Sequence, residues 1–155
     1  MAVPAPAPPV AAAKADLSKR FIAALIDIIP AFVVGLIPVI GGVLGAAYIL
    51  VRDGLELDFA DRRSIGKKVM KLRPVRLDGQ PMNLETSIKR NLPFCVGVIG
   101  MIFSPIPLLG LLIAIVVGIL ALIIALIELL LVVSDAEGRR MGDKFAGTKV
   151  IEVNE

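Results

Sequence analysis

The sequence predicts an all-α membrane protein with four transmembrane helices arranged as two hairpins. Lys and Arg are absent from residues 21–51 and again from residues 91–138. Stretches with so few charges are typical of membrane spans, because a helix needs about 20 apolar residues to cross a hydrocarbon layer of roughly 30 Å. The basic residues form three groups: three before Phe21, ten from Arg52 to Arg90 and four after Gly138. Two hairpins place all three groups on one face of the membrane, as the positive-inside rule requires.

The composition limits the classes of function that the chain can serve. It has 155 residues, 57% of them hydrophobic, with a mean hydropathy of +0.86, which predicts one small membrane domain. It contains no His and a single Cys, so an intrachain disulfide is impossible and zinc has few ligands. No nucleophile and base pair and no cofactor motif is present. We therefore expect no enzyme, no metal, no cofactor and no nucleic acid partner.

The chain is expected to begin with a tail and continue as one membrane domain. Residues 1–16 open with a Pro/Ala-rich run that lacks the charged start and apolar core of a signal peptide. This composition predicts a disordered cytoplasmic tail. Residues 17–155 form the membrane domain.

The first uncharged stretch is expected to fold as two short spans, 18–36 and 39–53. Glycines and a proline near position 38 mark the turn between them. Gly41 and Gly45 are four residues apart, a spacing that allows two helices to approach closely, and Gly97 is expected to play the same packing role in the third span.

The second uncharged stretch must fold back on itself. As one helix, residues 91–134 would be about 66 Å long at about 1.5 Å per residue, twice the thickness of the membrane. Ser104, Pro105 and Pro107 mark the turn, because proline removes a backbone donor and restricts the preceding residue. The predicted spans are 92–104 and 108–133.

The loop 54–91 and the tail 134–155 are both placed in the cytoplasm. The loop is basic, and a group of its cations is expected to contact anionic lipid head groups or a partner: Arg62, Arg63, Lys67, Lys68 and Lys71. Leu84, Ile88 and Leu92 recur every four residues after Asn83, which predicts an N-capped amphipathic helix at the membrane interface.

The loop and the tail also resemble each other. The segment that starts at Arg62 and contains Gly66 is echoed, with one gap, by the segment that starts at Arg139 and contains Gly142. This echo predicts a parallel repeat of two hairpin units. Residues 72–77 and 148–153 alternate well enough to be short strands, which we expect to pair on the cytoplasmic face.

Asp27 is the only charge in the first uncharged stretch, and ionisable groups at such depth are functional-site hypotheses by default. Pro30 cannot donate to the carbonyl of Ile26, so a free carbonyl oxygen would lie near the carboxylate. Such an arrangement resembles the irregular backbone sites that bind Na⁺ or H⁺ in transporters. Alternatively, Asp27 pairs with Arg20, two helical turns away, or with a neighbouring hydroxyl, and fixes helix packing.

Glu128 reaches about the same depth as Asp27 from the opposite direction along the chain. Two adjacent carboxylates would raise one pKa and could hold a single proton, which suits proton-coupled exchange. The alternative is that Glu128 stays protonated and hydrogen-bonds across helices. Asp53, at the end of the second span, is expected to form an ion pair with Arg20 that closes the cytoplasmic mouth of the first hairpin.

Several of these residues carry a resemblance to a known family. The segments that carry it are Arg20 to Asp27, Tyr48 with Asp53, Arg63 to Lys68, Arg90 with Asn91, and Gly142 to Val150. Over about residues 17–153 the chain resembles the RDD family of small bacterial membrane proteins. The resemblance implies that Arg20, Asp27 and Asp53 are the family's naming residues, and that Asp143, Gly147 and Thr148 belong to its motif in the tail. It also implies the bacterial inner membrane as the location. Some members of the family are described as cation/proton antiporters.

Two functions follow from these observations. The first is proton-coupled transport of monovalent cations, with Asp27 and Glu128 as the ion site, Arg20 and Asp53 as the inner gate, and a homo-oligomer to enclose the pathway. The second is a non-transporting scaffold or accessory subunit that binds lipid or a membrane protein partner through its basic loop. Both readings place the N- and C-termini in the cytoplasm.

Overall fold

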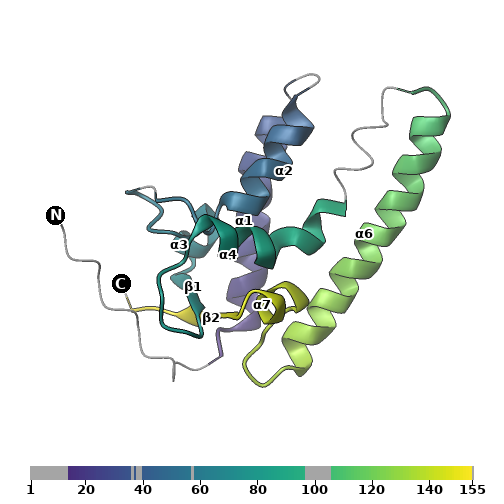
Figure 1. The fold of residues 1–155 in the computed structure, drawn as a ribbon. Helices are drawn as coiled ribbons and strands as arrows, with labels where there is room; N and C mark the ends of the chain where they lie inside the picture. The colour runs from purple at the N-terminus through teal and green to yellow at the C-terminus, as the bar shows by residue number, and fades with distance from the viewer. Residues whose placement is uncertain (1–13, 36, 38–39, 57, 97–105, 155) are drawn as a thin grey trace.

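The computed structural model describes residues 14–35, 37, 40–56, 58–96 and 106–154, and its long helices project from a group of short elements (Figure 1). The long helices are α1 (Leu17–Gly35), α2 (Gly41–Val51) and α6 (Leu109–Ser134). The short elements, which we call the cap, are α3 (Ile65–Val69), β1 (Leu72–Arg76), α4 (Leu84–Asn91), α7 (Met141–Phe145) and β2 (Thr148–Glu152). A 3-10 helix, η1 (Leu92–Cys95), continues α4.

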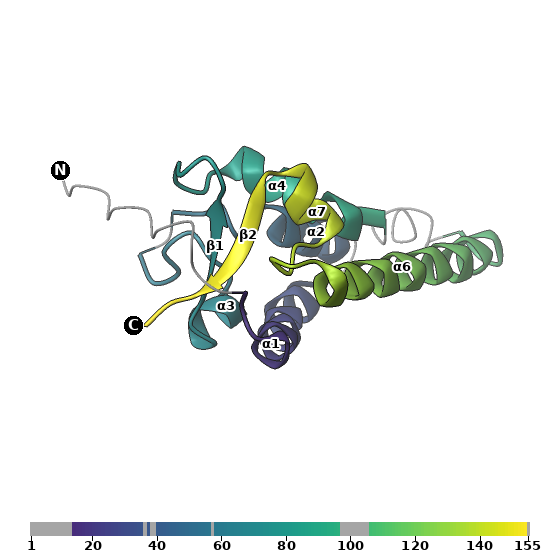
Figure 2. The same ribbon diagram turned by 90° about the horizontal axis from the view of Figure 1, so that it is seen from below.

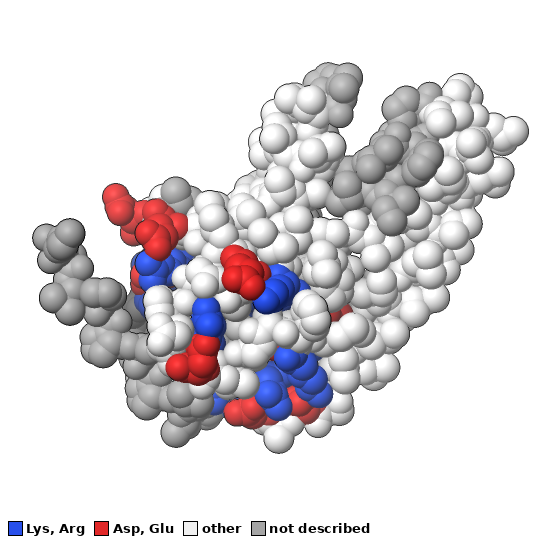
Figure 3. All heavy atoms as spheres, viewed as in Figure 1, with Lys and Arg blue, Asp and Glu red and all other residues white. Residues whose placement is uncertain are grey.

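The described part of the chain contains one helix, α6, that is long and apolar enough to cross a membrane. Its most apolar window has a mean hydropathy of 3.3 and is only 6% buried inside the protein. α2 is apolar but shorter. Charged side chains gather on the cap, whereas the projecting ends of the long helices show none on the face in Figure 3. These features support a membrane protein, while the four spans remain a prediction.

The predicted spans correspond unequally to observed helices. Residues 18–36, 39–53 and 108–133 correspond to α1, α2 and α6. The predicted span 92–104 begins in η1, but residues 97–105, including Gly97, lie outside the described residues. α1 and α2 pack against each other, and a Cβ at Gly45 would lie 3.2 Å from the carbonyl oxygen of Ala31. The glycine therefore permits the close approach of these two helices.

The cap contains the two strands that the alternating sequence predicts. β1 and β2 pair antiparallel, with Leu72 opposite Glu152 and Arg76 opposite Thr148. Figure 2 shows this pair from below, with α6 extending away from it. Leu72 and Val150 are buried together with Ala15 and Ala23, so the ladder closes over the base of α1.

The two halves of the cap repeat one local structure. α3 and α7 are both five residues long, and each is followed by a five-residue strand. The residue before each strand has a positive φ, 55° at Lys71 and 62° at Gly147. Pro74 and Val150, each at the centre of its strand, face each other in the ladder. A local two-fold axis therefore passes between the strands, consistent with the predicted repeat.

The repeat extends to the helices that begin each half. Asp16 accepts the backbone N–H of Lys19 before α1, and Asn83 accepts that of Thr86 before α4, as an N-cap does. The short helix of each half packs on the helix that opens it. A Cβ at Gly66 would lie 1.9 Å from the carbonyl oxygen of Ala23 in α1, and one at Gly142 would lie 1.9 Å from that of Arg90 in α4. Only glycine fits either contact.

The amphipathic helix predicted after Asn83 is α4. Leu84, Ile88 and Leu92 are exposed along one side, whereas Ser87 and Arg90 on the opposite side have no exposed surface. The apolar side is thus free to face a membrane interface.

Candidate functional site

Asp27 is buried and holds together α1, α2 and α3. Its Oδ1 accepts the backbone N–H of Gly66 at 2.7 Å, and its Oδ2 lies 3.2 Å from Nη1 of Arg52. The side chain is 2% exposed. The alternative in which Asp27 pairs with Arg20 or a hydroxyl is therefore wrong in its partner, because Arg52, which follows α2, takes that place.

Glu128 plays the matching role in the second half. Its carboxylate accepts the backbone N–H groups of Met141 at 2.7 Å and Gly142 at 3.3 Å, which are the first residues of α7. Backbone N–H groups in the first turn of a helix have no partner within the helix, so an acid there satisfies them. Each of the two deep acids thus binds the short helix of its own half.

Asp53 has no exposed surface and draws its partners from α3 and α4. Its Oδ1 lies 2.6 Å from Nζ of Lys67, and it also accepts the backbone N–H of Ser64. On the other side, Nη1 of Arg90 lies 3.6 Å from Oδ2. The neighbouring cations of Asp53 are therefore Lys67 and Arg90.

The predicted ion pair between Arg20 and Asp53 is wrong. Nη2 of Arg20 lies 3.4 Å from Oδ2 of Asp143, and Nη1 donates to the carbonyl oxygen of Gly138. The cause is the fold of the cap, which the depths of Arg20 and Asp53 along their helices do not determine. α3 and α4 bring their cations to Asp53, whereas α7 brings a carboxylate to Arg20.

Asp143 joins the two halves through Arg90. Nη2 of Arg90 donates to Oδ1 of Asp143 at 2.7 Å, and neither side chain has exposed surface. Arg140 lies 3.4 Å from the same carboxylate, and the hydroxyl of Thr148 donates to it at 3.3 Å. Arg90 therefore bridges Asp143 in one half and Asp53 in the other.

We call these charges, which are buried or half-buried, the ionic cluster. It comprises Arg20, Arg52, Lys67, Arg90 and Arg140 together with Asp27, Asp53, Glu128 and Asp143. The roles of Arg52, Arg90 and Arg140 were not predicted from the sequence. The echo between the halves carried the missing signal, because aligning Gly66 with Gly142 would have placed both short helices, and their charges, against the long ones.

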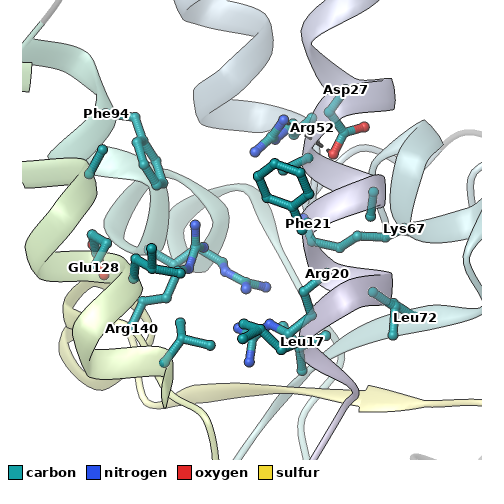
Figure 4. A pocket seen from close by; sticks show the side chains of 17 residues that line it. Leu17, Arg20, Phe21, Asp27, Arg52, Lys67, Leu72, Phe94, Glu128 and Arg140 are labelled. Carbon is teal, nitrogen blue, oxygen red and sulfur yellow. Dashed lines mark ion pairs between the residues drawn. The ribbon is translucent and has the colours of Figure 1, made fainter. Parts of the chain in front are cut away.

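A cavity of about 200 Å³ adjoins the ionic cluster (Figure 4). α1 forms one wall with Leu17, Arg20 and Phe21, and α6 forms the opposite wall with Glu128 and other residues. Asp27 lies at the side of the first wall, paired with Arg52 (Figure 4). Asp27 and Glu128 therefore line one cavity, but each binds its own backbone partner.

The described residues contain no group of three or more His, Cys, Asp or Glu side chains that could hold a metal ion. Arg140 also stacks over the ring of Phe94, with 5.0 Å between the guanidinium carbon and the ring centroid. This stacking adds a cation–π contact beside the cavity.

The basic residues expected to contact lipid are divided between core and surface. Arg63 is 1% exposed and Lys67 is 9% exposed, so the expectation that they contact lipid from the loop surface is wrong. The ionic cluster and the turn before α3 bury them. Arg62 pairs with Glu56, while Lys68 and Lys71 lie at the surface.

Lys67 and Asp143 are among the charged groups outside the long helices whose pKa values are shifted. Burial lowers the pKa of Lys67 to about 7, an effect that the negative charge of Asp53 opposes. Burial alone would raise the pKa of Asp143, but the positive charges of Arg90, Arg140 and Arg20 outweigh it and hold this pKa well below its ordinary value. Asp143 therefore stays ionised down to low pH in the folded protein.

We expect acid to destabilise the protein through Asp143. The folded-state pKa of this carboxyl lies below its unfolded value of about 3.9, so the unfolded chain binds more protons as the pH falls. The stabilisation is complete above about pH 5 and is lost below it. The unfolding temperature of the purified protein in detergent should be lower at pH 3 than at pH 6. This difference should be smaller in Asp143→Asn. An equal fall in both proteins would contradict the assignment.

Comparison with known proteins confirms the family resemblance. Residues 43–147 match the model of the RDD family. This range contains Asp53, Arg90, Glu128 and Asp143, whereas Arg20 and Asp27 precede it. No curated protein and no solved structure matches the chain.

Proposed function

The chain belongs to the RDD family, and we propose that it acts as a non-transporting membrane scaffold or accessory subunit. Its cap would lie at the cytoplasmic face of the bacterial inner membrane, with both termini on that side. There it would contact anionic lipid head groups and a partner protein, and a homo-oligomer is compatible with the exposed apolar helices.

The observation that carries this proposal is that the deep acids are already engaged. Asp27 binds a backbone N–H and Arg52, and Glu128 binds two backbone N–H groups. Asp27 neutralises the charge of Arg52, and both acids accept backbone N–H groups in the first turn of a short helix. These contacts stabilise the fold. Five cationic side chains surround the four acids of the ionic cluster, and their charge disfavours the binding of a further cation.

Proton-coupled cation transport is the second candidate. It is favoured by one observation, that Asp27 and Glu128 line the same cavity. A transported ion would have to displace the Arg52 guanidinium from Asp27, so the carboxylate would alternate between two partners.

The variant Asp27→Asn separates the two candidates. A scaffold predicts a loss of about 2 kcal/mol in the free energy of unfolding, because a hydrogen-bonded charge pair is removed. A transporter predicts a stable variant that has lost cation-dependent proton flux. Thermal unfolding in detergent and dissipation of a pH gradient in proteoliposomes measure both quantities on one preparation.

Glu85→Gln is the matched control, because Glu85 forms an exposed ion pair with Lys89. Exposed pairs contribute little, so this variant should unfold like the wild type. A stable Asp27→Asn protein that differs from wild type only in flux would overturn the scaffold proposal.

A further inference from the structure

The cavity exists because the two-fold repeat is broken at one pair of positions. Arg20 in α1 and Ser87 in α4 each follow their helix N-cap, Asp16 or Asn83, by four residues. Ser87 is small, and its hydroxyl donates to the carbonyl oxygen of Leu50 at 2.6 Å. α4 therefore packs directly on α2.

Arg20 gives a different result in the other half. It reaches past the end of α6 to Gly138 and Asp143. The cavity lies between α1 and α6, at the place where the repeat would put a contact like that of α4 with α2. The long side chain of Arg20, at the position where the other half has a serine, thus leaves a cavity between α1 and α6.

The charge around this cavity favours an anion. The ionic cluster contains five cations and four carboxylates, which leaves one positive charge in excess. All five cations line the cavity, but only two of the carboxylates, Asp27 and Glu128, do so. A ligand in the cavity therefore meets more positive than negative groups.

Two buried guanidinium Nε atoms next to the cavity have no hydrogen-bond partner among the described residues. They are Nε of Arg90, whose side chain has no exposed surface, and Nε of Arg52. A buried donor without a partner costs free energy comparable to a lost hydrogen bond. Two such donors beside one cavity indicate that an acceptor is bound there.

The rest of the lining is apolar and continues onto the surface that faces lipid. Phe21 on α1 and Leu129 on α6 both line the cavity, yet they are 61% and 47% exposed. Ala24 and Ala125 complete these two walls. An occupant can therefore hold its charged group at the cluster while its apolar part leaves between α1 and α6.

We propose that the cavity binds the head group of a phospholipid with one net negative charge. The phosphodiester accepts hydrogen bonds from Arg20, Arg52 and Arg90, and its single charge neutralises the cluster. The acyl chains lie along the apolar walls of α1 and α6. This proposal rests on the membrane location in the proposed function, but it does not depend on the absence of transport.

Native mass spectrometry of the full chain in non-ionic detergent tests the proposal. The protein is titrated with phosphatidylglycerol, with zwitterionic phosphatidylcholine and with inorganic phosphate at pH 6, where Lys67 keeps its charge. We expect phosphatidylglycerol to bind at least about tenfold more tightly than phosphatidylcholine. Equal binding of the two lipids would overturn the proposal, and so would inorganic phosphate that displaces the bound lipid and binds in its place.

Ala125→Phe fills the cavity without changing a charge, and Ala114→Phe is its matched control. Ala114 is an exposed residue of the same helix outside the cavity. Ala125→Phe should weaken phosphatidylglycerol binding by about tenfold or more, and Ala114→Phe should leave it unchanged. Ala24→Phe fills the same cavity from α1, so a folding defect at Ala125 leaves the test intact. Unchanged binding in both filled variants would overturn the proposal.

These outcomes are distinct from those that test the scaffold. Cation-driven flux would overturn the proposed function and leave selective lipid binding in place. Loss of lipid selectivity would overturn the cavity assignment alone.

Discussion

Gly142→Ala is expected to destabilise the protein by about 3 kcal/mol or more, because a Cβ there would lie 1.9 Å from the carbonyl oxygen of Arg90. The backbone fixes the position of the Cβ, and the atom that it meets is a backbone oxygen, so a side-chain rotation cannot relieve the clash. α7 would have to move off α4, and Glu128 would lose its two backbone partners. Thermal unfolding of the purified variant in detergent measures the effect.

The repeat predicts the same result for Gly66→Ala, whose Cβ would lie 1.9 Å from the carbonyl oxygen of Ala23. Gly118→Ala is the control, since nothing outside the adjacent backbone of its own helix, α6, lies within 4 Å of a Cβ at that position. If Gly142→Ala or Gly66→Ala unfolded like the wild type, the corresponding short helix would not pack as described.

Arg90→Leu is expected to cost about 3–5 kcal/mol in the free energy of unfolding. Arg90 is fully buried between Asp143, at 2.7 Å, and Asp53, at 3.6 Å. Removing one partner of a buried ion pair leaves the other charge in a site with too little compensation. Because Arg90 links the two halves, we also expect the cap to unfold less cooperatively with the helices.

Lys89→Leu is the matched control, one residue earlier in the same helix. Lys89 pairs with Glu85, and both side chains are largely exposed. Such surface pairs contribute at most about 1 kcal/mol. In chemical unfolding, the loss in the free energy of unfolding should be several-fold larger for Arg90→Leu than for Lys89→Leu. Equal losses would contradict the bridging role of Arg90.

The long helices were predictable because membrane-length apolar stretches are a strong and local signal. α1, α2 and α6 lie close to the ranges that the missing charges indicate, and the alternation of residues 72–77 and 148–153 predicts β1 and β2. The capping role of Asn83 is also local, because its partner is three residues away. Such features depend on neighbours in the sequence.

The charge pairing was harder to predict because it depends on how the cap folds back. Arg20 and Asp53 were expected at similar depths on neighbouring helices. Their depth does not predict which charged side chains of the loop and the tail pack between them. Lys67 reaches Asp53 from α3, and Asp143 reaches Arg20 from a segment more than 100 residues later. The repeat was visible in the sequence. Its structural consequence is that a glycine of each short helix packs on the helix that opens its half, and this contact depends on tertiary packing that the sequence pattern does not reveal.

The measurement that tests the proposed function most directly is cation-triggered dissipation of a pH gradient by wild-type protein in proteoliposomes. Na⁺, K⁺ and Li⁺ are each added to vesicles that contain correctly folded protein, with protein-free vesicles as the baseline. The engagement of Asp27 by Arg52 and of Glu128 by α7 predicts no dissipation above that baseline for any of the three cations. Dissipation that requires the protein and one of these cations would contradict the scaffold and establish the chain as a transporter.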